Sequence, residues 1–298
     1  MTQEHSLPIN DEAIQLSEEE AAGLASELKT LLREGKLGDS DTAQIQRMVA
    51  GLGDPRGLLR LTFAESLGAV GASAVPALCA AMRNHQNVTV RRAAAKTLTL
   101  IGDPQSLPAL LDSLLNDADP VVQGSAVGAM AAIGAESVDV LLEVLLQPEA
   151  TAMQIGLASW GLSFVGAKAP EALRKAAQSE HAEIRTAAIA ALGDQIQSLE
   201  DEQAKVLLMN ALNDQASDVR AEASTLLGKL HDADWAEPLL LPMIADNEPQ
   251  VRKNAALSLM KLGASEATPA LKEQDSLEQD PTVKSILRLA INQLNDTD

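Results

Sequence analysis

The stretch Asn87–Leu115, NVTVRRAAAKTLTLIGDPQSLPALLDSLL, decides the fold of this chain. After a polar turn, apolar residues return every three or four positions up to Ile101. The segment Gly102-Asp103-Pro104 interrupts this pattern, and a second apolar run follows it. Apolar residues with that spacing line one face of an α-helix. The stretch therefore predicts two short helices joined by a tight turn.

The same pattern recurs along most of the chain. We call the helix that contains Arg91, and its equivalents, the second helix of each repeat. One position of this helix is usually basic and recurs at spacings of 31, 32, 31, 31, 35, 32 and 32 residues, and we call it the arginine column: Arg60, Arg91, Gln123, Gln154, Arg185, Arg220, Arg252 and Lys284. Offsets of −1, +3, +7 and +10 from the column are apolar except at Gly161 and Gln195. One hairpin cannot bury its own apolar face, so neighbouring hairpins must stack. We predict an all-α solenoid of about eight hairpins.

The ends of the repeats set the expected domain limits. Residues 1–16 are predicted to be a disordered N-terminal tail, 17–53 two capping helices, 54–294 the solenoid and 295–298 a C-terminal tail. Ser17 with Glu20 and Asp41 with Gln44 have the spacing of capping boxes. The spacing of 35 predicts a longer loop over 193–203. Glycines at offset +11 predict left-handed helix caps at Gly71, Gly102, Gly134 and Gly263.

Composition excludes some functions. The formal net charge is −19, and nucleic-acid binding requires clustered Lys and Arg, so nucleic acid is not expected as a partner. The chain is 46% hydrophobic but 1% aromatic, with no Tyr, as suits closely packed Ala- and Leu-rich helices. Cys79 is the only cysteine, which excludes an internal disulfide. The sequence shows neither a signal peptide nor a membrane span, and we expect a cytoplasmic protein.

The repeat resembles a known family. The pattern Val-Arg-x-x-Ala-Ala followed by Gly-Asp-Pro and Pro-Ala-Leu-Leu, as in Asn87–Leu115, is similar to the HEAT-like repeats of the cyanobacterial phycobilin lyase clan. The resemblance covers roughly Arg56 to Leu294 and implies a HEAT-repeat fold. The clan includes phycobilin lyase subunits of the E/F type, phycobilisome-degradation proteins and an IscA-interacting HEAT-repeat protein. Asp119–Met130, DPVVQGSAVGAM, and the lack of Tyr look closest to the IscA-interacting branch.

The middle of the chain departs from the repeat pattern. No Lys or Arg lies between Lys96 and Lys168, whereas eight acidic residues do: Asp103, Asp112, Asp117, Asp119, Glu136, Asp139, Glu143 and Glu149. Such a region attracts basic surfaces. We predict a partner-binding surface for a basic protein, made of Asp119, Gln123, Glu143, Gln154 and Trp160. In the alternative, both glutamines replace arginine only structurally, and nearby glycines accommodate Trp160 in the core.

The arginine column has a structural interpretation. The guanidinium groups bridge acidic residues of the turns and hold adjacent layers together as a ladder.

The sequence offers no catalytic residues. It lacks the motifs of nucleotide, metalloprotease and nucleophilic-serine sites, and its four histidines are not paired at helical spacing. Cys79 is predicted either to be a small buried side chain or to ligate an iron–sulfur cluster that is shared with a partner. No cofactor is expected for the chain in isolation; a shared iron–sulfur cluster or a bilin in a heterocomplex are the candidates.

Two functions stay open. The favoured one is a non-enzymatic scaffold or adaptor that binds a protein, such as an IscA-like iron–sulfur carrier or a phycobiliprotein. The alternative is a phycobilin lyase-like protein that handles a bilin within a heterocomplex. Apolar pockets with a few placed polar groups usually hold such ligands, and the scarcity of aromatic side chains favours the scaffold.

Overall fold

The computed structural model describes residues 14–295, and these are helical with no strand among them. The chain divides into two compact units, Met1–Ile133 and Gly134–Asp298, which are described separately. Most of the predicted N-terminal tail, residues 1–13, and the last residues of the predicted C-terminal tail, 296–298, lie outside the described part.

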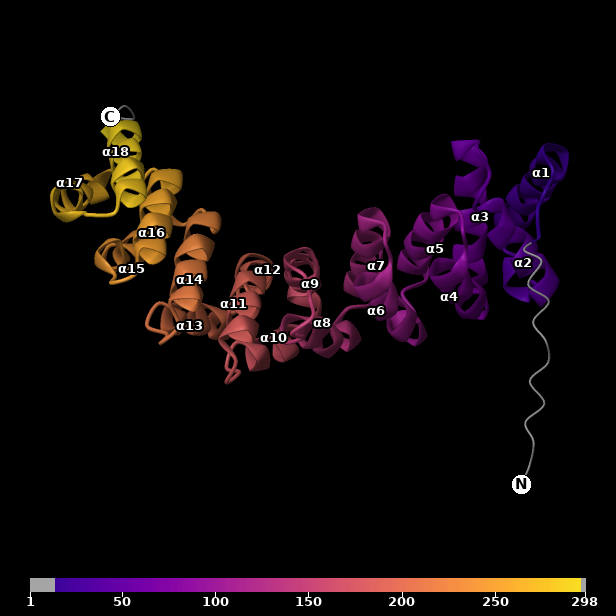
Figure 1. Cartoon of the computed structure of the whole chain (residues 1–298), viewed down its shortest axis with the longest axis horizontal. Helices are drawn as coiled ribbons and strands as arrows, with labels where there is room; N and C mark the ends of the chain where they lie inside the picture. The colour runs from indigo at the N-terminus through magenta and orange to yellow at the C-terminus, as the bar shows by residue number, and fades with distance from the viewer. Residues whose placement is uncertain (1–13, 296–298) are drawn as a thin grey trace, which may run out of the picture. The chain divides into compact units, whose positions relative to one another are not determined.

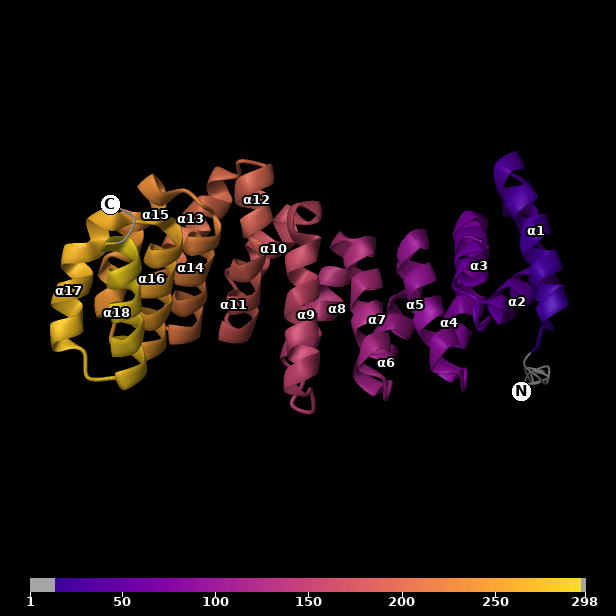
Figure 2. The same ribbon diagram turned by 90° about the horizontal axis from the view of Figure 1, so that it is seen from above.

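Unit 1 is built from two layers of helices. Its helices are α1 (Glu18–Glu34), α2 (Thr42–Gly51), α3 (Gly57–Val70), α4 (Val75–Asn84), α5 (Val88–Ile101), α6 (Leu107–Asn116) and α7 (Pro120–Ile133). The longer helices α1, α3, α5 and α7 pack in sequence order, and α2, α4 and α6 form the second layer beneath them. Figure 2 shows α3, α5 and α7 side by side. Each hairpin thus covers the apolar face of its neighbour.

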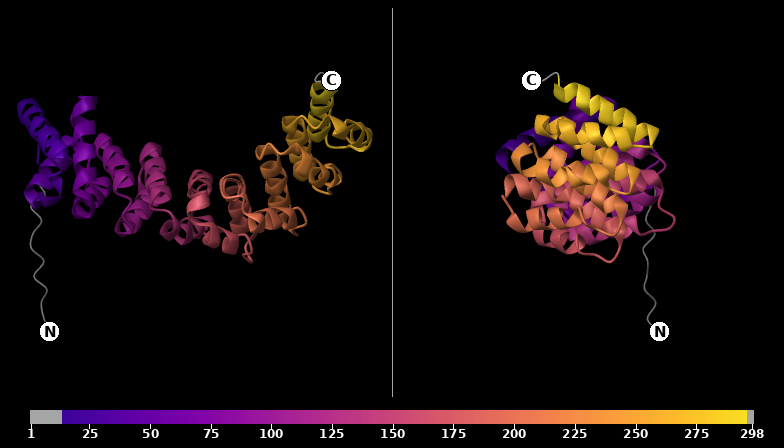
Figure 3. Two further views of the ribbon diagram at one scale, coloured as in Figure 1. Left: turned by 180° about the vertical axis from the view of Figure 1, so that it is seen from behind. Right: turned by 90° about the vertical axis from the view of Figure 1, so that its left-hand side faces the viewer.

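Unit 2 repeats this arrangement. Its helices are α8 (Val138–Leu145), α9 (Ala152–Val165), α10 (Pro170–Ala176), α11 (Ala182–Ala191), α12 (Gly193–Ser198), α13 (Glu202–Ala211), α14 (Ser217–Lys229), α15 (Ala233–Leu240), α16 (Pro249–Leu262), α17 (Thr268–Leu277) and α18 (Pro281–Asn295). Helices α9, α11, α14, α16 and α18 pack in order, and α8, α10, α13, α15 and α17 pack beneath them. Figures 1 and 3 show the last of these helices stacked in the orange and yellow part of the chain. The predicted all-α HEAT-type solenoid is confirmed within each unit.

Short 3-10 turns join many of the helices. They are η1 (Leu37–Asp39), η2 (Gly71–Ala74), η3 (Pro104–Ser106), η4 (Ala135–Ser137), η5 (Gly166–Lys168), η6 (Pro242–Ala245) and η7 (Ser265–Ala267). The four glycines predicted to end second helices all have positive φ, between 65° and 92°. Ser17 and Glu20 form the predicted capping box at the start of α1. Gly102 and Gly263 adopt the predicted left-handed caps, whereas Gly71 and Gly134 combine positive φ with ψ of −139° and −128°. At the start of α2 the Asp41 carboxylate accepts from the backbone N–H of Gln44, which is one half of the predicted capping box.

The prediction of a longer loop over 193–203 is wrong in part. Helix α12 occupies Gly193–Ser198, and only the residues after it are irregular. Gln195, which breaks the apolar pattern, is fully buried, and its Nε2 donates to the carbonyl oxygen of Gly166 at 3.4 Å. Helix α12 therefore takes up much of the longer spacing, and the amide of Gln195 packs within the core because a backbone carbonyl accepts its hydrogen.

The arginine column forms the predicted structural ladder. Arg91 donates from Nη1 to the carbonyl oxygens of His85 and Gln86, and from Nε and Nη2 to the carboxylate of Asp117 in the next turn. In unit 2 the same bidentate pairs link three further repeats: Arg185 with Asp214, Arg220 with Asp246, and Arg252 with Glu278. Each guanidinium thus orders its own turn and fastens the following one.

One part of the described chain, Gly57–Asn84, is long and apolar enough by composition to cross a membrane. It consists of α3, η2 and α4, and the backbone turns at Gly71, where φ is 73°. Phe63 and Leu67 of this segment are completely buried in the protein core. Its apolar character therefore has a packing explanation.

Candidate functional site

Helix α9 is rotated from the orientation that the repeat pattern predicted. Gln154 is only 6% exposed and belongs to a capping box, in which its Oε1 accepts from the backbone N–H of Thr151 at 2.8 Å. The buried side of α9 then continues through Ala158, Leu162 and Val165. Placing Gln154 in the arginine column is therefore wrong by one residue. Ile155 has the column position, and Gly166 follows it at offset +11 with φ 37°.

This rotation exposes large apolar side chains. Met153 is 55%, Trp160 45% and Phe164 59% exposed, and with Gly156 they follow one side of the helix. We call these four residues the α9 face. The ring centroids of Trp160 and Phe164 lie 4.6 Å apart at an interplanar angle of 51°. Two aromatic rings are thus held together in contact with solvent.

The exposure of Trp160 contradicts the alternative in which glycines accommodate it in the core. Elsewhere in the chain, Phe63 is completely buried and Trp235 is half-buried, with the Lys205 ammonium 5.9 Å from its ring centroid. The chain has only these four Trp and Phe residues and no Tyr. Half of its aromatic side chains therefore lie on one open helix face, where they add little to the core.

The C-terminal end of α9 is held firmly. The carboxylate of Asp194 accepts from the backbone N–H of Ala167 at 3.2 Å and from the hydroxyl of Ser198 at 2.7 Å. Gly166 has φ 37°, which side-chain-bearing residues rarely adopt, and a Cβ there would also lie only 3.1 Å from Asp194. The α9 face is consequently presented on a fixed helix, which reduces the ordering cost of binding.

The predicted partner-binding residues of unit 1 have structural contacts. The Asp119 carboxylate forms a bidentate pair with Arg92, at 2.9 and 2.5 Å, and accepts from the N–H groups of Val121 and Val122. The hydrogen bonds from Arg92, and then those from the backbone, lower the pKa of Asp119 to about 2. Gln123 donates from Nε2 to the carbonyl oxygen of Asp117 at 2.8 Å, which replaces one arginine contact. A partner-binding role for either residue stays a prediction.

The remaining predicted residues belong to unit 2. Trp160 lies on the α9 face, whereas the Gln154 side chain is buried on the other side of the same helix. Glu143 is exposed on α8, which belongs to the other layer and packs against α9. The structure thus does not bring Glu143 and Gln154 to the face that presents Trp160. Met153, Gly156 and Phe164 were missed, and the Thr151–Gln154 capping box was the signal that could have revealed them.

Cys79 lies on α4 and is partly buried. Burial raises the pKa of its thiol above the ordinary value, more than the nearby Arg83 lowers it. In the described residues, no group of three His, Cys, Asp or Glu side chains could hold a metal ion. Ligation of a shared iron–sulfur cluster by Cys79 stays a prediction that would need ligands from another chain.

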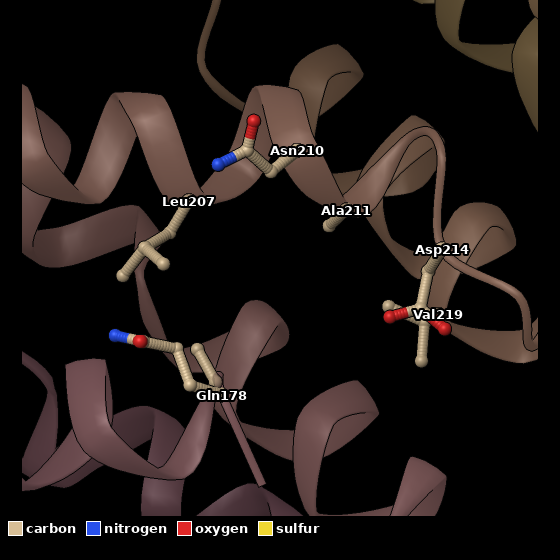
Figure 4. A pocket seen from close by; sticks show the side chains of 7 residues that line it. Gln178, Leu207, Asn210, Ala211, Asp214 and Val219 are labelled. Atoms are coloured by element: carbon tan, nitrogen blue, oxygen red, sulfur yellow. The ribbon is translucent and has the colours of Figure 1, made fainter. Parts of the chain in front are cut away.

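A small pocket in unit 2 is lined by Ala177, Gln178, Leu207, Asn210, Ala211, Asp214 and Val219. Gln178 and Asn210 lie on opposite walls (Figure 4). Its volume is about 190 Å³. Pockets that enclose a drug-sized ligand usually exceed roughly 300 Å³. This pocket is therefore too small to enclose a large ligand.

The α9 face carries no group for acid–base or nucleophilic chemistry. Its aromatic rings offer π faces to a flat ligand, and the thioether of Met153 makes favourable contacts with aromatic systems. No charged side chain belongs to it. The nearest in sequence are Glu149 and Lys168, beyond its two ends. The face therefore suits a flat, apolar or conjugated surface.

The stacked helical hairpins define a helical-repeat protein. A family model described as HEAT repeats matches residues 45–131, 75–158 and 204–292. The bilin biosynthesis protein MpeU of Synechococcus sp. (strain WH8020) is 47% identical over 279 residues, which cover 94% of each chain. The chain belongs to the HEAT-repeat family and, within it, to the family of MpeU.

Two other similarities agree with this assignment. The uncharacterized phycocyanin operon protein Z of Pseudanabaena tenuis (strain PCC 7409) is 36% identical over 124 residues, which cover 39% of this chain and 61% of that protein. A chain of the Kap95:Nup1 complex matches 94% of this chain and 44% of its own length at 15% identity and a TM-score of 0.51, which shows the fold alone. The names of the two sequence relatives refer to bilins and phycocyanin. The resemblance to the phycobilin lyase clan is thus supported, and the IscA-interacting branch is not.

Proposed function

We propose that this protein binds a bilin on the α9 face and presents it to a phycobiliprotein, as a phycobilin lyase-like member of the HEAT-repeat family. The observation that carries the proposal is the exposed pair Trp160–Phe164. Bilins are flat, conjugated open-chain tetrapyrroles, and such systems stack on aromatic rings. The relationship to MpeU supports this ligand class over an iron–sulfur cluster.

The chemistry of the face limits what the chain would do. Because the face has no cysteine, histidine or lysine, the covalent bond to an acceptor protein would be formed by a side chain of that acceptor. The HEAT-repeat chain would hold and orient the bilin, which lowers the entropic cost of the reaction. Holding a ligand and docking a protein are compatible roles, so the scaffold interpretation becomes part of the bilin-handling one.

A titration with phycocyanobilin tests the proposal. The wild-type protein is expected to shift the visible absorbance of the bilin and to lose tryptophan fluorescence as the bilin is added. Replacing Trp160 or Phe164 by alanine should each weaken binding about tenfold, since losing one stacked ring costs about 1.4 kcal/mol.

Leu289→Ala is the matched control. Leu289 lies on α18 and is 50% exposed, close to the exposure of Phe164, so its truncation removes a similar exposed apolar side chain elsewhere in unit 2. It should leave the titration unchanged. Equal affinity of all the variants for phycocyanobilin would show that the bilin does not bind to the α9 face.

A further inference from the structure

Gly156 lies in the interior of helix α9 without any need from the fold. Glycine in the middle of a helix is destabilising by roughly 0.5–1 kcal/mol relative to alanine. At two other glycines the lack of a side chain is explained by packing. A Cβ on Gly166 would lie 3.1 Å from Asp194, and a Cβ on Gly228 would lie 2.4 Å from the Ser258 hydroxyl oxygen. A Cβ on Gly156 would meet nothing within 4 Å. Packing within the protein therefore does not explain the missing side chain.

Two other helical glycines, Gly23 on α1 and Gly128 on α7, are equally open. The neighbours of Gly156 distinguish it from them. Its neighbours one turn away are Ala152, Met153, Ser159 and Trp160, and of these Met153 and Trp160 are large and about half exposed. The corresponding neighbours of Gly23 are Glu19, Glu20, Ser26 and Glu27, and those of Gly128 are Gly124, Ser125, Ala131 and Ala132.

The α9 face therefore has no side chain at Gly156, which lies between the exposed residues Met153, one turn before it, and Trp160, one turn after it. We call this position of bare helix backbone the notch. The notch lies on the same side of the helix as Phe164, and Trp160 lies between them. A flat group lying over it would contact the helix backbone, with exposed apolar residues one turn away in either direction along the helix.

We propose that this notch receives one terminal ring of the bilin, whose conjugated system then extends over Trp160 and Phe164. The inference rests on the proposed function and adds a subsite and an orientation to it. A flat ring fits a gap that is one residue wide, whereas a partner helix would need a broad surface: stable protein interfaces usually bury more than about 1,000 Å². The uncharged lining also suits the ring system of a bilin better than its propionates.

The inference is tested by refilling the notch in the full-length protein. Gly156→Ala adds one methyl group into open space, so it should raise the unfolding midpoint while it weakens phycocyanobilin binding about tenfold, which corresponds to about 1.4 kcal/mol. Gly156→Leu should weaken binding further, because its side chain fills the notch. A more stable protein that binds less well cannot be explained by damage to the fold.

Gly23→Ala and Gly128→Ala are matched controls. Both make the same chemical change in an equally open helical position and should stabilise the protein without altering the titration. If both Gly156 variants kept the wild-type affinity for phycocyanobilin while Trp160→Ala and Phe164→Ala lost binding, the notch would be refuted as a subsite for the bilin. The proposed function would still hold. If wild-type protein gave no absorbance shift with phycocyanobilin, or if none of the substitutions on the α9 face changed it, the notch and the proposed binding face would both be refuted.

Discussion

Replacing Glu278 by glutamine should destabilise the C-terminal repeats strongly. The Glu278 side chain is 1% exposed, and its two carboxylate oxygens each accept from Arg252 at 2.7 Å. The backbone N–H groups of Gln279 and Asp280 donate to the same carboxylate. Glutamine keeps the shape but removes the charge, and it turns one accepting oxygen into a donor that faces the guanidinium.

The size of the effect follows from the pKa. The hydrogen bonds from Arg252, and then those from the backbone, lower the pKa of Glu278 from 4.5 to about 2. At about 1.4 kcal/mol for each pKa unit, the carboxylate stabilises the folded state by about 3 kcal/mol at neutral pH. Loss of one partner from a buried pair usually costs roughly 3–5 kcal/mol, which agrees.

The sign of the pH dependence is fixed by the same values. Because the pKa of Glu278 is lower in the folded state, its carboxylate contributes fully to the stability of that state above about pH 4.5. This contribution is lost as the pH falls towards about 2. Urea unfolding followed by circular dichroism should therefore show a difference in the free energy of unfolding between wild type and Glu278→Gln. This difference should be largest at neutral pH and should decrease below about pH 4.5.

The control is Asp275→Asn. Asp275 pairs with Arg288 at 3.1 Å, but that guanidinium is 62% exposed, so its loss should cost less than about 1 kcal/mol. Equal destabilisation by the two variants, or a gap that does not depend on pH, would refute the view that the arginine ladder stabilises the repeats through buried charge pairs.

The remaining predictions concern the core of unit 1. Phe63→Ala should destabilise the protein by about 3–5 kcal/mol in urea unfolding, because Phe63 is completely buried and its ring packs directly against Gly51; a change below about 1 kcal/mol would contradict this packing. Cys79 should react with iodoacetamide more slowly in the native protein than in urea at neutral pH, since burial raises the pKa of its thiol. Equal rates would mean that α4 does not bury this thiol.

The repeat architecture could be predicted because it rests on local signals. Helix periodicity, the glycines after second helices and the Ser17–Glu20 box each depend on a few neighbouring residues. The arginine ladder could also be predicted, since its spacing equals that of the repeat. Its acidic partners, such as Asp214 for Arg185, follow at the next turn.

The candidate site was located only in part, because one residue of register decides which side of a helix is buried. A step of one residue turns a helix by about 100°. With Gln154 in the arginine column, Met153 and Phe164 were expected in the core, and both are exposed. Apolar residues on both sides of α9 made the two registers look alike. The choice between the two registers depends on packing against neighbouring helices, and the apolar pattern within one helix gives no information about that packing.

The same capping box explains how the repeat of α9 dispenses with a ladder cation. In five other repeats an arginine orders the turn before the second helix by donating to two carbonyl oxygens, as Arg220 does to those of Asp214 and Gln215. Before α9, Thr151 and Gln154 order the turn through each other instead. A neutral, buried glutamine thus replaces an arginine, and Ile155 can occupy the column position. The first turn of α9 gains no guanidinium, so its exposed side can be an uncharged surface for a flat conjugated ligand.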